Sequence, residues 1–197
     1  MPKLGMAPIR RRQLIDAAIA SIHEYGLADA TVARIARKAG VSPGIVHHYF
    51  ADKEELLFAT MRTMLEILRR EALERLSEAK GPRQRIDAII DACFARSQFS
   101  PDVMVAWLAL YGSARQSERL ARILKLYHRR LRANLLIALR ELVPEGRAQD
   151  LAEGIAAMID GLYLRYALRG TRVDPAHPRR LTRDYVDAAL SAVPGGA

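Results

Sequence analysis

Apolar residues recur every three to four positions along most of the chain, and no stretch alternates steadily between apolar and polar residues. One such stripe contains Ile15, Ala18, Ile19 and Ile22. This spacing places the apolar side chains on one face of an α-helix. Glycine and proline interrupt the pattern, and the segments between them are candidate helices at about 11–25, 32–39, 43–50, 53–80, 83–99, 102–115, 117–142, 147–170 and 178–192.

The boundaries of the first four candidate helices carry residues that are typical of helix caps. Gly26 and Gly40 follow the first two helices, where glycine tolerates the left-handed backbone that ends a helix. Thr31, Ser42 and Asp52 precede the next three, where a side-chain oxygen accepts a hydrogen bond from a free N–H group. These signals predict three short helices followed by a long one.

The whole pattern predicts an all-α protein of about nine helices. We expect three compact N-terminal helices, a long connecting helix and a larger C-terminal helical bundle. The predicted domain boundary follows the third helix, with a DNA-reading domain at 1–53 and a helical domain at 54–197.

Residues 31–50 have the build of a helix-turn-helix, with the sequence TVARIARKAGVSPGIVHHYF. A short amphipathic helix leads through a glycine turn into a second, capped helix. We expect the second helix to pack Ile45 and either Val46 or Tyr49 inward. Small residues at its start suit a helix that enters the major groove of DNA. The positions left open to solvent are Pro43, Gly44, His47 and His48.

Charge supports a polyanionic partner for this motif. The chain has 31 basic and 22 acidic residues, a formal net charge of +9, and its first 53 residues have 8 and 4, a net charge of +4. A modest local excess of this kind suits contacts with phosphates. The alternative is a three-helix subdomain with a solvated basic face. The basic positions around the motif are Lys3, Arg10, Arg11, Arg12, Arg34, Arg37, Lys38 and Lys53, and we take Arg10, Arg11 and Arg34 as DNA-binding candidates.

Several other classes of protein are disfavoured. The chain has no phosphate-binding glycine loop, HExxH, nucleophile elbow or CxxC, so we expect neither an enzyme nor a cofactor. His47 and His48 point about 100° apart on a helix, so they do not form a metal site. The single Cys93 favours a reducing, cytoplasmic setting. No apolar run approaches the roughly 18 to 20 residues that span a bilayer.

The run GVSPGIVHHYFADKEELL resembles the recognition helix and the following helix start of TetR-family bacterial transcriptional regulators. The resemblance implies that Tyr49 and Lys53 contact phosphates and that Phe50 packs in the core. It also implies that Thr31 anchors its helix. The resemblance further implies that the residues facing the DNA bases are Pro43, Gly44 and His47. Many relatives have tyrosine where His47 stands and a polar residue where Pro43 stands, so the operator sequence does not transfer.

Three further segments are similar to one TetR subgroup, the BetI-type choline-responsive repressors of glycine betaine synthesis. These segments are MPKLGMAPIRRRQLIDA, FSPDVMVAWLALYGSAR and IDGLYLR. The resemblance implies a homodimeric repressor that binds an inverted repeat of double-stranded DNA and responds to choline. An inducer other than choline, still small and cationic, is the alternative. A basic helical adaptor or membrane-surface protein is a more distant one.

Aromatic residues in the C-terminal part suit a quaternary ammonium ligand such as choline. Their spacing along the predicted helices permits an aromatic box with a nearby carboxylate. The alternative is ordinary core packing, and for Asp160 a helix bend or a pair with Arg165. The candidate ligand-binding residues are Trp107, Tyr111, Asp91, Phe94, Asp160 and Tyr163.

Small and apolar residues near the C-terminus suit a dimer interface. Ala157 and Gly161 lie one turn apart and permit two helices to approach closely. TetR regulators generally dimerise through their last two helices, which agrees with this placement. The other candidates are Leu164, Leu168, Leu181 and Tyr185. The arginine-rich stretch 115–140 is interpreted as a solvated helix face, with a second nucleic-acid or membrane surface as the alternative.

Overall fold

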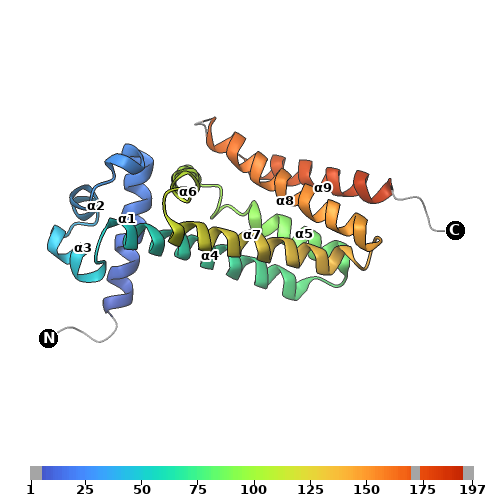
Figure 1. Cartoon of the computed structure of the whole chain (residues 1–197), viewed down its shortest axis with the longest axis horizontal. Helices are drawn as coiled ribbons and strands as arrows, with labels where there is room; N and C mark the ends of the chain where they lie inside the picture. The colour runs from blue at the N-terminus through green and yellow to red at the C-terminus, as the bar shows by residue number, and fades with distance from the viewer. Residues whose placement is uncertain (1–5, 170–173, 193–197) are drawn as a thin grey trace. The chain divides into compact units, whose positions relative to one another are not determined.

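The structure is a computed structural model that describes residues 6–169 and 174–192, so Lys3 lies outside the described residues. Within those ranges every regular element is a helix (Figure 1). The all-α prediction of about nine helices is therefore confirmed. The helices are α1 (Met6–Asp29), α2 (Val32–Lys38), α3 (Pro43–Tyr49), α4 (Lys53–Glu78), α5 (Pro82–Cys93), α6 (Pro101–Ser113), α7 (Glu118–Leu139), α8 (Glu145–Ala167) and α9 (Ala176–Ser191).

Most of the predicted caps are present. Gly26 and Gly40 have φ angles of 74° and 67°, in the left-handed region that favours glycine. The Thr31 Oγ1 accepts a hydrogen bond from the Arg34 N–H at 3.3 Å, and the Asp52 Oδ1 accepts one from the Glu55 N–H at 2.7 Å. Ser42 is different. It occupies the N-cap position of α3 with extended backbone, but its side chain makes no capping hydrogen bond.

The first compact unit comprises residues 1–65 and 101–123. In it α1 packs against both α2 and α6, and α2 packs against α3. The predicted stripe of α1 is buried, from Ile15 to Ile22. The unit includes α6 because that helix covers α1. The predicted division at residue 53 separates a DNA-reading domain from a helical domain by function, and it stays a prediction.

The second compact unit comprises residues 66–100 and 124–197. In it α9 packs against both α5 and α8, two helices that precede it in the sequence (Figure 1). Its fully buried side chains include Ile86, Ile90 and Phe94 of the α5 region. Among the described helices none is both long enough and apolar enough to cross a membrane.

Candidate functional sites

The helix α3 turns one narrow face inward and leaves the rest open. Val46 and Phe50 are buried, whereas Pro43, Gly44, His47 and His48 are exposed. The expectation that Ile45 packs inward is wrong, because its side chain is 40% exposed. A helix turns about 100° per residue, so with Val46 inward its neighbour at 45 points along the flank. Tyr49 lies half-buried beside this face.

Three of the predicted DNA-binding cations are held by backbone carbonyls around α3. The Lys53 Nζ donates to the carbonyls of Leu27 at 2.7 Å and Ala28 at 3.1 Å. The Arg11 guanidinium donates to the Tyr49 carbonyl at 3.3 Å and lies 4.5 Å from the centre of the Phe50 ring. These contacts tie α1 to both ends of the α3–α4 connection, and no sequence signal pointed to them.

The third of these cations is Arg34. Its guanidinium donates to the Asp29 carbonyl at 2.9 Å and lies 4.6 Å from the centre of the Tyr25 ring. Arg10 instead bonds to the side chain of Gln13 on α1. All four side chains are half-buried, so each keeps part of its charged end at the surface of the N-terminal helices.

Two of the ligand-binding candidates share one aromatic cluster in the second unit. Phe94 and Tyr163 each lie edge-on to Phe99, with ring centres 5.4 and 5.3 Å from it. The Tyr163 hydroxyl donates to the carbonyl of Gln98 at 2.6 Å, which fixes the direction of the ring. Phe94 is fully buried, so its ring packs inside this cluster and does not face solvent.

Trp107 and Tyr111 belong to the first unit. Their ring centres lie 5.5 Å apart on α6, as the spacing of four residues predicts. Trp107 is buried and Tyr111 is half-buried. The two rings therefore belong to α6, the helix that packs against α1 in the first unit.

Asp160 is the half-buried carboxylate of the second unit. The His128 Nε2 lies 3.6 Å from its Oδ2, so the observed ion-pair partner is His128, and not the Arg165 of the alternative interpretation. Burial raises the pKa of the Asp160 carboxyl, His128 lowers it, and Glu153 raises it further. Burial also raises the pKa of the Cys93 thiol to about 12, with a contribution from the charge of Asp160. Asp160 therefore lies in a partly desolvated place beside His128, Glu153 and the uncharged Cys93 thiol.

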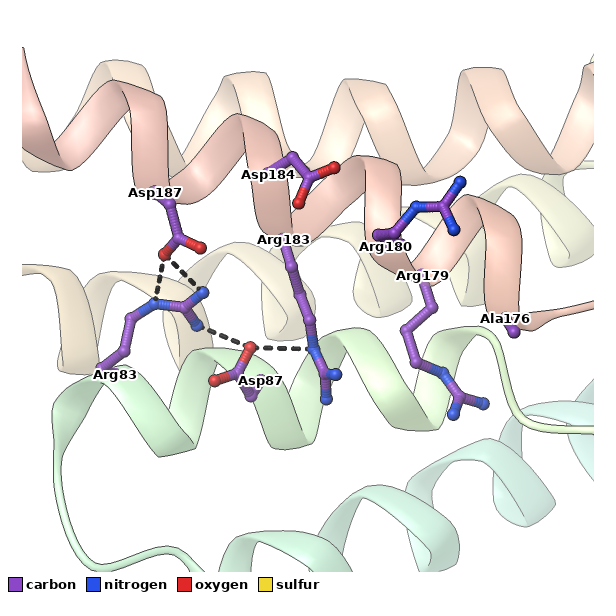
Figure 2. A pocket seen from close by; sticks show the side chains of 8 residues that line it. All are labelled: Arg83, Asp87, Ala176, Arg179, Arg180, Arg183, Asp184 and Asp187. Atoms are coloured by element: carbon purple, nitrogen blue, oxygen red, sulfur yellow. Dashed lines mark hydrogen bonds and ion pairs between the residues drawn. The ribbon is translucent and has the colours of Figure 1, made fainter.

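The other candidate carboxylate, Asp91, lies in a row of ion pairs between α5 and α9. The Arg183 Nη2 is 2.7 Å from both of its carboxylate oxygens, and the Arg179 Nε is 3.3 Å from one of them. Further along, Asp87 pairs with Arg183, and Arg83 pairs with Asp87 and Asp187 (Figure 2). We call the six residues the α5–α9 ladder; they are Arg83, Asp87, Asp91, Arg179, Arg183 and Asp187.

The α5–α9 ladder borders a groove of about 480 Å³ that no sequence expectation covered. Its lining has four arginines and three aspartates and no aromatic side chain (Figure 2). A quaternary ammonium prefers aromatic faces and a free carboxylate, so this groove does not suit it. The sequence contains a signal for this ladder, because charged residues recur every four positions in both helices. The charges run plus, minus, minus along α5 and plus, plus, minus along α9, so antiparallel pairing places each residue opposite one of the other sign.

The predicted dimer residues form an open apolar face on α8 and α9. Leu164 and Leu168 are 47% and 71% exposed, and Ala157 is also exposed. Gly161 and Leu181 are half-buried. Tyr185 is partly exposed and lies over Gly154, which brings α8 and α9 close together within the chain. The close approach expected at Ala157 and Gly161 concerns the dimer partner and stays a prediction.

Comparison with known proteins gives consistent matches over nearly the whole chain. Residues 14–60 match the family described as bacterial regulatory proteins, tetR family, and residues 82–191 match the BetI-type transcriptional repressor C-terminal family. The HTH-type transcriptional regulator BetI of Rhizobium meliloti is 48% identical over 98% of this chain and 95% of its own.

Solved structures share the fold. A putative transcriptional regulator from Pseudomonas aeruginosa matches with a TM-score of 0.74 and 27% identity, over 94% of this chain and 92% of its own. A putative regulator from Saccharomonospora viridis, solved in complex with choline, matches with a TM-score of 0.76 and 19% identity, over 90% of this chain and 95% of its own.

Proposed function

The chain belongs to the TetR family of bacterial regulators, with a C-terminal domain of the BetI type, and from this premise we propose that it controls choline-to-glycine-betaine genes with choline as inducer. It is a DNA-binding transcriptional repressor and not an enzyme. Regulators of this family bind operator DNA and act as dimers. We further propose a cytoplasmic protein that binds an inverted repeat.

The open face of α3 is the observation that carries the proposed DNA contact. Exposed small residues at its start, Pro43 and Gly44, let the helix approach base edges closely. His47 and His48 follow on the same side and offer ring nitrogens to bases or phosphates. In a two-fold dimer two such helices enter successive major grooves about 34–36 Å apart.

The phosphate contacts are proposed for the cations and hydroxyls around this face. Backbone carbonyls hold the charged ends of Lys53 and Arg11 in place. A DNA phosphate can accept hydrogen bonds from the same N–H groups. Tyr49 lies between them at the end of α3. The remaining proposed DNA contacts are Arg10, Thr31, Arg34 and Ser42.

Selection from a random duplex library, followed by affinity measurements over a salt series, tests the DNA contact. The selected inverted repeat should bind more tightly than its scrambled version, and affinity should fall steeply with salt. Lys53→Ala should weaken both duplexes about equally, whereas His47→Ala should change the selected bases. Equal affinity for the selected and scrambled duplexes would overturn the proposal.

Asp160 is the proposed carboxylate for the choline ammonium. Asp91 carries short contacts to two arginines, whereas Asp160 has one histidine partner at 3.6 Å. The Tyr163 ring lies one helical turn further along α8, beside Phe99 and Phe94. Burial around Asp160 strengthens its attraction for a cation. Trp107 and Tyr111, which belong to the first unit, stay proposed ligand-binding residues.

A matched pair of variants separates the two carboxylates. Asp160→Asn should weaken choline binding at least tenfold in isothermal titration calorimetry. Asp91→Asn should leave choline affinity within about threefold, while lowering the free energy of unfolding by about 1 kcal/mol because it breaks partly exposed ion pairs. Loss of choline binding in Asp91→Asn but not in Asp160→Asn would show that Asp91 is the carboxylate that binds choline. A wild-type protein that binds DNA and ignores choline would indicate a different inducer.

The proposed dimer face is the apolar surface of α8 and α9. Its exposed leucines, Leu164 and Leu168, are costly to leave in water. Ala157 and Gly161 permit close approach of a second copy, and Leu181 and Tyr185 continue the face on α9. Leu168→Glu should convert the dimer to a monomer in analytical ultracentrifugation.

A further inference from the structure

A histidine, which is cationic when protonated, lies beside the proposed choline carboxylate. The His128 Nε2 of α7 lies 3.6 Å from the Asp160 Oδ2 of α8. Both side chains are partly exposed, so a solute can reach the pair from solvent. The neighbouring Tyr127 ring lies 5.2 Å from the His128 ring, centre to centre.

The remaining titratable and charged groups around Asp160 come from two other places. Glu153 is on α8 and adds negative charge near Asp160. Cys93 is at the end of α5, and its thiol interacts with Tyr127 of α7. The pKa of Cys93 is about 12, so the thiol carries no charge near neutral pH. Histidine is the side-chain type among these groups that can hold or release a proton under physiological conditions, and His128 is the histidine in contact with Asp160.

We propose that His128 is a built-in competitor for the cation site at Asp160, so that binding of a permanent cation displaces the imidazolium and releases its proton. This inference rests on the proposed function, since it takes Asp160 as the ammonium-binding carboxylate. Two positive charges cannot share one carboxylate at contact distance without repulsion. Binding of the ligand cation therefore favours the neutral imidazole.

The proton balance fixes the direction of the effect. The protonated histidine enters the reaction with its carboxylate partner, and the products are the ligand–carboxylate pair, a neutral histidine and one proton in solution. A quaternary ammonium has no proton to lose, so the ligand stays charged at every pH. Linkage then requires that acid weakens ligand binding and that ligand makes His128 harder to protonate.

Calorimetry in two buffers of different ionisation enthalpy counts the protons released. Choline and tetramethylammonium are the probes, and pH 6.5 is suitable because imidazole is then about half-protonated in its ordinary state. The wild-type protein should release a measurable fraction of a proton for each cation bound. His128→Gln should release less than a quarter of that amount and should bind choline more tightly at pH 6. His23→Gln, on an exposed position of α1, is the matched control and should behave like wild type.

The outcomes distinguish this inference from the proposed function. Equal proton release by wild type and His128→Gln assigns the proton to Asp160 and overturns the role of His128. No binding of either cation by a wild-type protein that binds DNA overturns the ammonium site itself. If His128→Gln fails to fold, NMR titration of the His128 ring in the wild-type protein replaces it. Choline should then lower the pH midpoint of that ring titration by at least half a pH unit. An unchanged midpoint contradicts the inference.

Discussion

At the scale of single residues, α3 gives adjacent side chains opposite environments. Val46 is 1% exposed, whereas Ile45 is 40% exposed and lies on a flank of the open face. An exposed isoleucine next to a proposed base-reading surface is suited to contact a thymine methyl group. The two residues therefore offer a test that separates packing from recognition within one helix.

Val46→Ala should lower the free energy of unfolding by about 2 kcal/mol, because it removes buried methyl groups and leaves a cavity. Ile45→Ala should lower it by less than about 1 kcal/mol but should weaken binding to the selected inverted repeat more than to a scrambled duplex. Chemical denaturation and DNA titrations measure the two effects. Loss of stability in Ile45→Ala as large as in Val46→Ala would place Ile45 in the core.

Local signals predict residue roles when the partner lies nearby in sequence. Thr31 and Asp52 cap their helices as expected, because the N–H group that they bind is three residues away. Ser42 occupies the N-cap position without the hydrogen bond, and nothing in its surroundings explains the difference from the equally exposed Thr31 and Asp52. Lys53 was expected to meet phosphate, and its carbonyl partners, 25 and 26 residues earlier, could not be foreseen from spacing.

At the scale of elements, the α7–α8 connection is held by one charged contact. The Arg140 Nε and Nη2 lie 2.7 and 2.8 Å from the carboxylate of Glu145, and Gln149 donates to it at 2.9 Å. Arg140 and then Gln149 lower the pKa of Glu145 to about 2, from an ordinary value of 4.5. The ionised form is therefore the one that the folded state favours.

A folded-state pKa below the ordinary value means that the contact stabilises the fold above pH 4.5 and that this contribution is lost as the pH falls toward 2. Glu145→Gln should thus be less stable than wild type at pH 6 and approach it in acid. Denaturation at a series of pH values from 3.5 to 7 measures this, with Glu141→Gln as a control on the same turn. A difference that is constant across the series would contradict the pKa assignment.

The contact between α8 and α9 depends on Gly154. A Cβ atom there would overlap the Tyr185 hydroxyl, whereas one at Gly146 would meet nothing. Because Tyr185 is partly exposed, its ring can swing away, and the monomer should stay folded. Gly154→Ala should therefore redirect Tyr185 and weaken the proposed dimer.

Sedimentation equilibrium of Gly154→Ala should give a dimer dissociation constant raised at least fivefold, and Gly146→Ala should not change it. In a Tyr185→Ala background, Gly154→Ala should add little, because the overlapping group is gone. An additive effect in the double variant would show that the two residues act independently. The spacing of Ala157 and Gly161 predicts a close approach of the dimer partner. It gave no sign of the contact between Gly154 and Tyr185 within the chain, because those two residues lie on different helices.

At the scale of the whole molecule, the first compact unit is discontinuous in sequence. It combines residues 1–65 with 101–123, because α6 packs along α1. Periodicity predicted both helices but not their contact, since an apolar stripe does not identify its partner. The helix-turn-helix was predictable because its turn, caps and recognition helix are contiguous, whereas the aromatic cluster around Phe99 joins segments more than 60 residues apart.

A fragment of residues 1–65 should fail to fold cooperatively, because the face of α1 that α6 covers is left in water. A fragment of residues 1–123 keeps α6 and should retain more tertiary structure. Thermal unfolding by circular dichroism and amide dispersion by NMR compare them. A shorter fragment that melts as sharply as the longer one would show that α6 is dispensable.

The packing of α6 on α1 also sets an order of events during synthesis. A ribosome releases the recognition helix early, but the helix that completes its unit follows only with residues 101–113. A nascent chain that ends before this point carries α3 and its surrounding positive charge without the rigid support that positions them. The recognition helix therefore gains its rigid support only about midway through translation, before the proposed dimer helices α8 and α9 are made. Truncated products should be poor competitors for the promoter.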